Sequence, residues 1–123
     1  MKTEQTDKLA TSRSALALGI PAMEMLGRVR VMVLGLGGVG SWAAEALVRT
    51  GVRHMALVDA DCVAVSNVNR QAPATMATVG RPKTEAMAAR LRDIAPDVDL
   101  ELFTVTYCEA TASGFDFENY DYV

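Results

Sequence analysis

Short apolar segments alternate along the chain with longer segments of helical periodicity. Residues 29–34 are almost entirely apolar and end abruptly in glycines, which is typical of a buried parallel strand. A second apolar run, residues 54–59, ends in a carboxylate. Between the two runs, from about residue 39 to residue 50, apolar residues recur at helical spacing. The three segments together predict a strand–helix–strand unit with parallel strands.

The rest of the chain extends this pattern. We predict a helix over about 82–95, a third strand over 98–103 and the opening of a fourth strand at 120–123. Before the first strand, we expect a flexible polar segment over 1–12 and a short helix over about 21–26. The pattern indicates an α/β fold, a Rossmann-like parallel sheet with flanking helices that occupies residues 13–123. Because a strand ending at residue 123 has no helix to carry it onward, we expect a fragment or truncated half of a larger domain.

Charge is unevenly distributed along the 123 residues. Residues 1–92 carry a net charge of +5 and residues 93–123 a net charge of −8, which gives −3 for the whole chain. The basic part holds the motifs that carry chemistry, which suits an anionic ligand. It has no dense basic stripe, so direct binding of tRNA or DNA by this segment is not implied. We expect a cytoplasmic protein with no membrane contact, since no apolar run could span a bilayer and the two cysteines form no CxxC pair.

The strongest local motif is the glycine-rich sequence that follows the first predicted strand. Gly35, Gly37, Gly38 and Gly40 let the backbone turn sharply and approach a phosphate at the amino end of the next helix. Asp59 ends the second strand, where a carboxylate binds ribose hydroxyls. We therefore predict a nucleotide site. The alternative is a tight turn needed only for packing the strand against the helix.

A long polar stretch, residues 60–79, separates the second strand from the next helix. Connections in α/β units are usually two to six residues, so one of this length suggests binding. Arg70 lies in this stretch and Lys83 begins the following helix. Two cations directed at one place favour a triphosphate, and hence ATP, over the pyrophosphate of NAD.

Three ordered motifs make this sequence resemble the ThiF/MoeB/HesA family of adenylating enzymes, which are related to ubiquitin-activating E1 enzymes. The motifs are GLGGVGSWAAEALVRTGV, LVDADCVAVSNVNRQ and TVGRPKTEAMAARLRDIAP. SNVNRQ, together with the RSALALG segment that begins at Arg13, is more similar to the tRNA threonylcarbamoyladenosine dehydratase branch than to MoeB or ThiF. The resemblance covers most of residues 13–123, which would form the N-terminal part of an E1-like domain.

The resemblance implies roles for individual residues. Arg70 and Lys83 would neutralise the phosphates during catalysis, and Arg13 would reach as an arginine finger into the site of the partner subunit. Asp59 would bind the ribose, while Asp61 would hold either a metal ion or the loop. The residues that would contact the nucleotide are Gly35, Gly37, Gly38, Gly40, Asp59, Asp61, Ser66, Asn67, Val68, Asn69, Arg70 and Lys83. The aspartate that holds Mg²⁺ in the family would lie beyond Val123.

The resemblance also implies a reaction and partners. The full-length enzyme would be a homodimer that uses ATP to adenylate the threonylcarbamoyl carboxylate of tRNA, which then closes into a ring, and this fragment alone would be inactive. Within the family, the alternative is adenylation of the C-terminus of a ubiquitin-like sulfur carrier, with a sulfur-carrier or cysteine-desulfurase-type partner. Outside it, the alternatives are an NAD(P)-dependent oxidoreductase and a non-catalytic scaffold.

Overall fold

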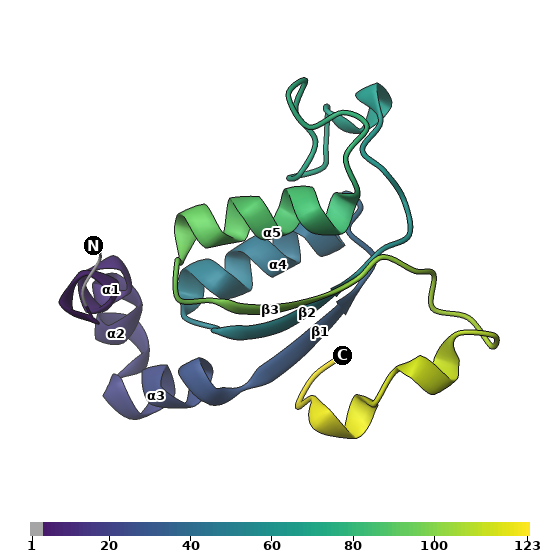
Figure 1. Ribbon diagram of the computed structural model, residues 1–123. Helices are drawn as coiled ribbons and strands as arrows, with labels where there is room; N and C mark the ends of the chain where they lie inside the picture. Colours follow the sequence, from purple (N-terminus) through teal and green to yellow (C-terminus); the bar gives the residue numbers. More distant parts are fainter. Residues whose placement is uncertain (1–3) are drawn as a thin grey trace.

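Parallel strands form the centre of the protein in the computed structural model, which describes residues 4–123 (Figure 1). Within this range the sheet contains β1 (Arg30–Leu34), β2 (His54–Val58) and β3 (Asp99–Phe103), in the order β1-β2-β3. Both strand pairs are parallel and in register, with Val31 opposite Met55 and Met55 opposite Leu100. The predicted Rossmann-like α/β fold is confirmed, and for these three strands each predicted boundary lies within one residue of the observed one.

Two helices cover one face of this sheet (Figure 1). They are α4 (Gly40–Thr50) and α5 (Lys83–Ile94), the helices predicted from the apolar periodicity. Val48 of α4 and Leu91 of α5 pack against Met55 and Leu57 of the central strand in the main apolar core. Because successive strand residues point to opposite faces, Met55 and Leu57 face the helices while Ala56 faces away.

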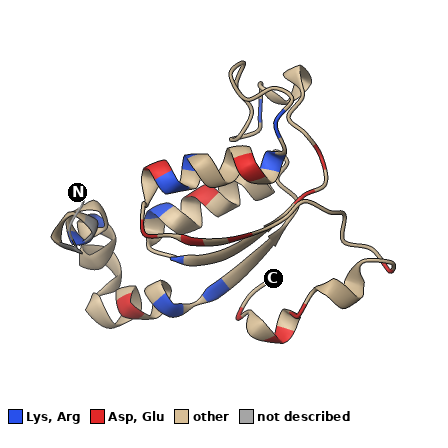
Figure 2. Cartoon of the chain, viewed as in Figure 1, with Lys and Arg blue, Asp and Glu red and all other residues tan. Residues whose placement is uncertain are grey.

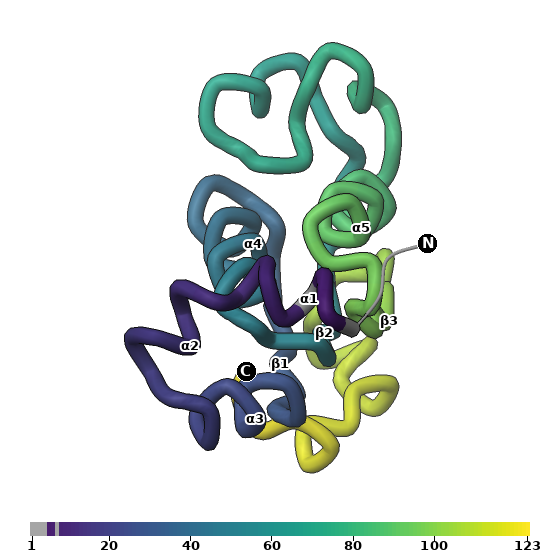
Figure 3. Tube along the Cα trace, turned by 90° about the vertical axis from the view of Figure 1, so that its left-hand side faces the viewer, coloured from purple at the N-terminus to yellow at the C-terminus, as the bar shows by residue number. Residues whose placement is uncertain are grey.

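The other face of the sheet is covered by the chain that follows β3 (Figures 1 and 3). This segment contains two short 3₁₀ turns, η2 (Ala112–Gly114) and η3 (Phe117–Asn119). Phe115 packs there against Met32, Ala56 and Val58. Figure 2 shows acidic but no basic residues along this segment, in agreement with the charge asymmetry of the sequence.

The predicted fourth strand is present only as a single bridge. Tyr122 pairs in parallel with Val31, and its carbonyl oxygen accepts the N–H of Met32 at 2.9 Å. The chain therefore returns to the free edge of β1, on the side of the sheet away from β2.

The N-terminal region contains more helix than the sequence pattern predicted. In addition to α3 (Ile20–Arg28), which extends the predicted 21–26 helix, the chain forms α1 (Glu4–Ala10) and α2 (Ser12–Leu18). Part of the segment expected to be flexible is thus helical, and residues 1–3 lie outside the described range. Helices this short are marginal in water, so contacts among α1, α2 and α3 stabilise them, and such contacts leave no periodic signal in a short sequence. Across the described residues, no helix has the length and apolar character needed to cross a membrane.

The polar stretch of residues 60–79, here called the polar loop, projects beyond α4 and α5 (Figures 1 and 3). It contains the 3₁₀ turn η1 (Val65–Asn67). Its two ends are joined by backbone hydrogen bonds, from Val63 N–H to the Arg81 carbonyl at 2.8 Å and from Gly80 N–H to the Val63 carbonyl at 2.8 Å. The loop therefore starts and finishes beside the carboxyl ends of the strands.

Candidate functional site

The glycine loop, residues 35–40, connects β1 to α4 in a tight turn. Gly35 has a φ of +94°, a conformation that residues with a Cβ rarely adopt. At Gly40 a Cβ would overlap the carbonyl oxygen of Gly35, so the beginning of the helix approaches the beginning of the loop closely. The backbone N–H groups of Ser41 and Ala43 donate to carbonyl oxygens of the loop, so the amino end of α4 retains only part of the set of N–H groups with which a helix N-terminus binds anions.

Asp59 fastens the glycine loop to the end of β2. Its Oδ2 accepts the N–H of Leu36 at 2.8 Å, and its Oδ1 accepts the N–H of Asp61 at 2.8 Å. A carboxylate oxygen can accept two hydrogen bonds, so both oxygens retain capacity for ribose hydroxyls. Asp59 was predicted only to bind ribose, and in the structure it also holds the glycine loop.

A cavity of about 330 Å³ opens at the carboxyl ends of the strands. Nucleotides bind in this position relative to open α/β sheets, and the volume lies at the lower end of the usual range for ligand pockets. The acidic side chains of Asp59 and Asp61 line one part of it, and Val105 and Tyr107, after β3, line another. The complete lining of this strand-end cavity is Leu34, Gly35, Val58, Asp59, Ala60, Asp61, Val105, Thr106 and Tyr107.

Lys83 lies next to this cavity, at the first position of α5. Its backbone N–H donates to the carbonyl oxygen of Asp61 at 2.9 Å, and its Nζ lies 3.9 Å from Asp61 Oδ2. Lys83 is only 6% exposed. An ammonium group is rarely buried to this extent without an anionic partner, and the long Nζ–Asp61 distance leaves the charge available to a ligand.

Arg70 lies against the glycine loop. Its Cγ and Cδ are both 3.6 Å from the position that a Cβ of Gly38 would occupy. Its Nη1 donates to the Ser66 carbonyl oxygen and to Asn69 Oδ1, both at 3.0 Å. The structure thus brings Arg70 to Gly38 and Lys83 to Asp61, on two adjoining parts of the strand-end region.

The other predicted residues of the polar loop make their described hydrogen bonds within the loop itself. Asn67 Oδ1 accepts the N–H of Ala64 at 2.9 Å and so caps the η1 turn. Ser66 and Val68 are exposed beside it. Asn67 and Asn69 therefore maintain the loop conformation that carries Arg70, as their hydrogen bonds lie within the loop.

Gln71 and Ser41 are polar residues of the site for which no individual role was predicted from the sequence. Gln71 is 7% exposed, and its Nε2 lies 4.0 Å from the position of a Gly37 Cβ. Its Oε1 is buried and has no hydrogen-bond partner among the described residues. Ser41 is fully buried and bonds to the Gly37 carbonyl oxygen. Gln71 ends the SNVNRQ motif, but its burial depends on long-range packing that the sequence pattern did not reveal.

Arg13 is the predicted residue that the structure keeps apart from the site. It is exposed on α2, which lies at the amino ends of the strands, whereas the glycine loop lies at their carboxyl ends (Figure 1). Within one chain, Arg13 therefore does not join Arg70 and Lys83.

Other reactive side chains also lie outside the site. His54 begins β2 at the far end of the sheet, with Nδ1 3.4 Å from Asp99 Oδ2. Cys108 lies in an exposed turn, and hydrogen bonds with the Thr111 side chain and the Thr111 and Ala110 backbone lower the pKa of its thiol. Among residues 4–123, no group of three or more His, Cys, Asp or Glu side chains is arranged to hold a metal ion.

Comparison with known proteins identifies the family. The ThiF family model matches residues 11–123. The tRNA threonylcarbamoyladenosine dehydratase of Bacillus subtilis is 47% identical over 112 residues, which cover 91% of this chain and 44% of that protein. The crystal structure of the Escherichia coli dehydratase superposes with a TM-score of 0.92 at 34% identity, over 100% of this chain and 51% of that one. The same enzyme in complex with ATP gives a TM-score of 0.86 at 34% identity, over 93% and 46% of the two chains. The chain thus spans about half the length of these relatives, and it belongs to the ThiF family.

Proposed function

We propose that the protein uses ATP to adenylate a carboxylate, and that the carboxylate is the threonylcarbamoyl group of a modified adenosine in tRNA. The observation that carries this proposal is the position of Arg70 over Gly38. A guanidinium group there lies beside the amino end of α4, where backbone N–H groups and the helix dipole already favour an anion.

Relatives of known structure support ATP as the nucleotide. The Escherichia coli dehydratase has been crystallised with ATP and with AMP, the nucleotide consumed and the nucleotide released in an adenylation cycle. A second relative, the molybdopterin-synthase adenylyltransferase of Salmonella typhimurium, is 43% identical over 77 residues and is named for adenylyl transfer. This family membership favours adenylation over a nicotinamide-dependent oxidoreductase.

The reaction divides into two steps. A carboxylate oxygen of the substrate attacks the α-phosphorus of ATP, and the bond from this phosphorus to pyrophosphate breaks, giving an acyl-adenylate. In the dehydratase reaction, a nitrogen or oxygen atom of the neighbouring carbamoyl group then attacks the activated carbonyl carbon. The bond from this carbon to the phosphate oxygen breaks, so that ring closure releases AMP and one N–H proton of the carbamoyl group. Arranged cations accelerate the first step, because negative charge shifts toward the leaving pyrophosphate in its transition state.

Each residue of the site has a part in this scheme. Asp59 accepts the ribose hydroxyls with the capacity that its bonds to Leu36 and Asp61 leave free. Arg70 contacts the phosphates beside Gly38, and the buried charge of Lys83 stabilises the departing pyrophosphate. Asp61 keeps Lys83 close to the strand-end cavity through its carbonyl oxygen and its carboxylate.

Two components of the proposal, the homodimer and Mg²⁺, do not follow from the contacts described above. Arg13 would act in the site of a second subunit, which is why a homodimer is part of the proposal. Mg²⁺ is expected with ATP, but among residues 4–123 no group of three or more His, Cys, Asp or Glu side chains is arranged to hold it. No step is therefore assigned to Mg²⁺ here.

ATP–pyrophosphate exchange by the full-length protein tests the proposal. Exchange that depends on threonylcarbamoyl-modified tRNA supports it. Exchange that depends instead on a ubiquitin-like sulfur-carrier protein, and not on tRNA, would assign the site to the other reaction of the family. ATP binding without exchange under either condition would refute adenylation and favour a scaffold.

A further inference from the structure

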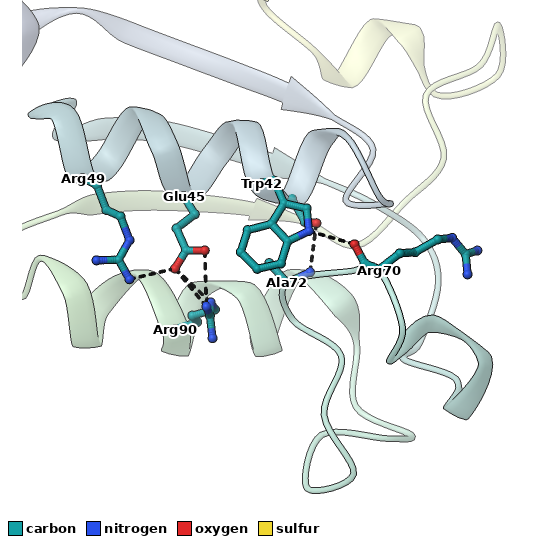
Figure 4. A network of polar contacts seen from close by, with 7 residues as sticks. Trp42, Glu45, Arg49, Arg70, Ala72 and Arg90 are labelled. Carbon is teal, nitrogen blue, oxygen red and sulfur yellow. Dashed lines mark hydrogen bonds and ion pairs between the residues drawn. The ribbon is translucent and has the colours of Figure 1, made fainter.

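We propose that Trp42, together with its neighbour Ser41, is a positioning residue that holds Arg70 against the glycine loop. Trp42 lies in the first turn of α4 and is 47% exposed. Its indole Nε1–H donates to the carbonyl oxygen of Arg70 at 2.8 Å (Figure 4). This inference rests on the proposed function, because it assigns Trp42 a task only through the contact of Arg70 with phosphate.

Ser41 fixes the same segment of chain from the other side of Gln71. Its Oγ donates to the Gly37 carbonyl oxygen and accepts the N–H of Ala72 at 3.1 Å. Trp42 and Ser41, consecutive residues of α4, thus hydrogen-bond to the backbone of Arg70 and of Ala72, respectively. The segment that carries Arg70 is therefore fixed to the helix turn on which the glycine loop ends.

The hydrogen bonds of Arg70 leave part of its guanidinium available. An arginine has five N–H donors, and the bonds to Ser66 and Asn69 both come from Nη1. The structure gives Nε and Nη2 no partner within the described chain. The aliphatic part of the side chain lies 3.6 Å from the Cβ position of Gly38, so small backbone shifts at Arg70 would move the free N–H groups away from the glycine loop.

An ion pair between Arg90 and the buried Glu45 lies against the indole ring (Figure 4). The Arg90 Cζ lies 5.7 Å from the centre of the Trp42 ring, close enough for a cation–π contact. Arg90 in turn donates from Nε and Nη2 to the two carboxylate oxygens of Glu45, at 3.1 and 3.3 Å. Glu45 is 3% exposed and also pairs with Arg49 at 3.1 Å. A carboxylate on the helix face shared by α4 and α5 thus fixes, through Arg90, the ring that holds the polar loop.

The test compares three variants of the full-length protein with the wild type. Trp42→Phe removes the N–H donor and keeps an aromatic ring for Arg90. Arg70→Ala removes the guanidinium, and the double variant combines the two changes. Val48→Ala is the matched stability control, because Val48 is buried in the core on the same helix and its side chain makes no hydrogen bond to the segment that carries Arg70.

We expect Trp42→Phe to raise the Kd for ATP, measured by calorimetry, and to lower kcat/KM of ATP–pyrophosphate exchange, each about three- to tenfold, the size expected for one hydrogen bond. In the Arg70→Ala background the same change should have no further effect. Trypsin should also cut between Arg70 and Gln71 faster in Trp42→Phe, as mass spectrometry of the fragments would show. Val48→Ala should lower the melting temperature but leave both the Kd for ATP and the rate of cleavage after Arg70 unchanged.

Three results would overturn the proposal. One is an unchanged rate of cleavage after Arg70 in Trp42→Phe. Another is an equal loss of ATP affinity with and without Arg70, which would mean that Trp42 acts on the fold alone. A third is a loss of ATP affinity in Val48→Ala that equals the loss in Trp42→Phe when the two variants show the same fall in melting temperature. Failure of the proposed function is distinguishable, because a wild type that binds no ATP would refute the role of Arg70 toward phosphate even where the cleavage result holds.

Discussion

The Asp59 carboxylate and the backbone N–H of Leu36 join the carboxyl end of β2 to the glycine loop through a bond of 2.8 Å. The same carboxylate lines the strand-end cavity, where the ribose of a nucleotide is expected. One side chain therefore sets the shape of the glycine loop and lines the strand-end cavity. We therefore expect a change at Asp59 to affect both the stability of the protein and its affinity for a nucleotide.

Asp59→Asn should weaken both functions. One of the two carboxylate oxygens becomes an NH₂ group, which faces the N–H of Leu36 or of Asp61 and cannot accept from it. We expect the free energy of unfolding to fall by about 1–3 kcal/mol and the Kd for ATP to rise about tenfold or more. Urea unfolding and calorimetry on the full-length protein would measure the two effects.

Comparison with 2′-deoxy-ATP separates the ribose contact from the effect on the loop. In the wild type, loss of the 2′-hydroxyl should weaken binding by about ten- to 100-fold, the value of one hydrogen bond to a charged group. In Asp59→Asn the two nucleotides should bind more nearly alike. If the variant discriminated between them as strongly as the wild type, Asp59 would hold the loop without touching the sugar.

Gly40→Ala should disrupt the junction between the glycine loop and α4. The added methyl group would overlap the Gly35 carbonyl oxygen, which is backbone and cannot rotate away. We expect a loss of about 3 kcal/mol or more in the free energy of unfolding. Gly27→Ala in α3 is the matched control, because open space surrounds that position and alanine favours a helix by about 1 kcal/mol, so this variant should be as stable as the wild type or more so. Similar unfolding midpoints for the two variants would contradict the close approach at Gly40.

The sequence predicted the scaffold of the site better than its side-chain contacts. The apolar residues 31–34, the glycines that follow and the terminal Asp59 are local signals, and each fixes one strand end or turn. The contact of Trp42 with Arg70 joins positions 28 residues apart, and the burial of Gln71 depends on the same packing. Neither Trp42 nor Gln71 belongs to a periodic hydrophobic pattern, so their contacts could be found only from the folded structure.

Tyr120→Phe should reveal a pH-dependent contribution to stability. The Tyr120 hydroxyl donates to Glu101 Oε2 at 3.0 Å, and burial of the ring, followed by the neighbouring Glu101, raises the pKa of the phenol. The folded state thus favours the neutral phenol. Its contribution is complete below the pKa of the unfolded chain, about 10, and is lost as the pH rises through the higher pKa of the folded state.

At pH 7 we therefore expect Tyr120→Phe to lower the free energy of unfolding by about 0.5–1.5 kcal/mol. The difference between wild type and variant should shrink as the pH is raised above about 10. Urea unfolding of both proteins at pH 7 and at increasing alkaline pH would measure it. A difference that stayed constant or grew would show that Tyr120 does not favour its neutral form in the folded protein.

Mixing two inactive variants would show in which subunit Arg13 acts. Because α2 and the glycine loop lie at opposite ends of the sheet, Arg13 can serve this active site only if it comes from a second copy of the chain (Figure 1). Arg13→Ala and Lys83→Ala should each reduce ATP–pyrophosphate exchange strongly, about 100-fold or more, since each removes a charge that stabilises the transition state.

In a heterodimer of the two variants, the site that keeps Lys83 receives the intact Arg13 from its partner. Random re-association of equal amounts should then restore about one quarter of the wild-type activity, because half of the dimers are mixed and each mixed dimer has one complete site. Mixtures that stay as inactive as the separate variants, although mass spectrometry shows that mixed dimers form, would remove Arg13 from the site.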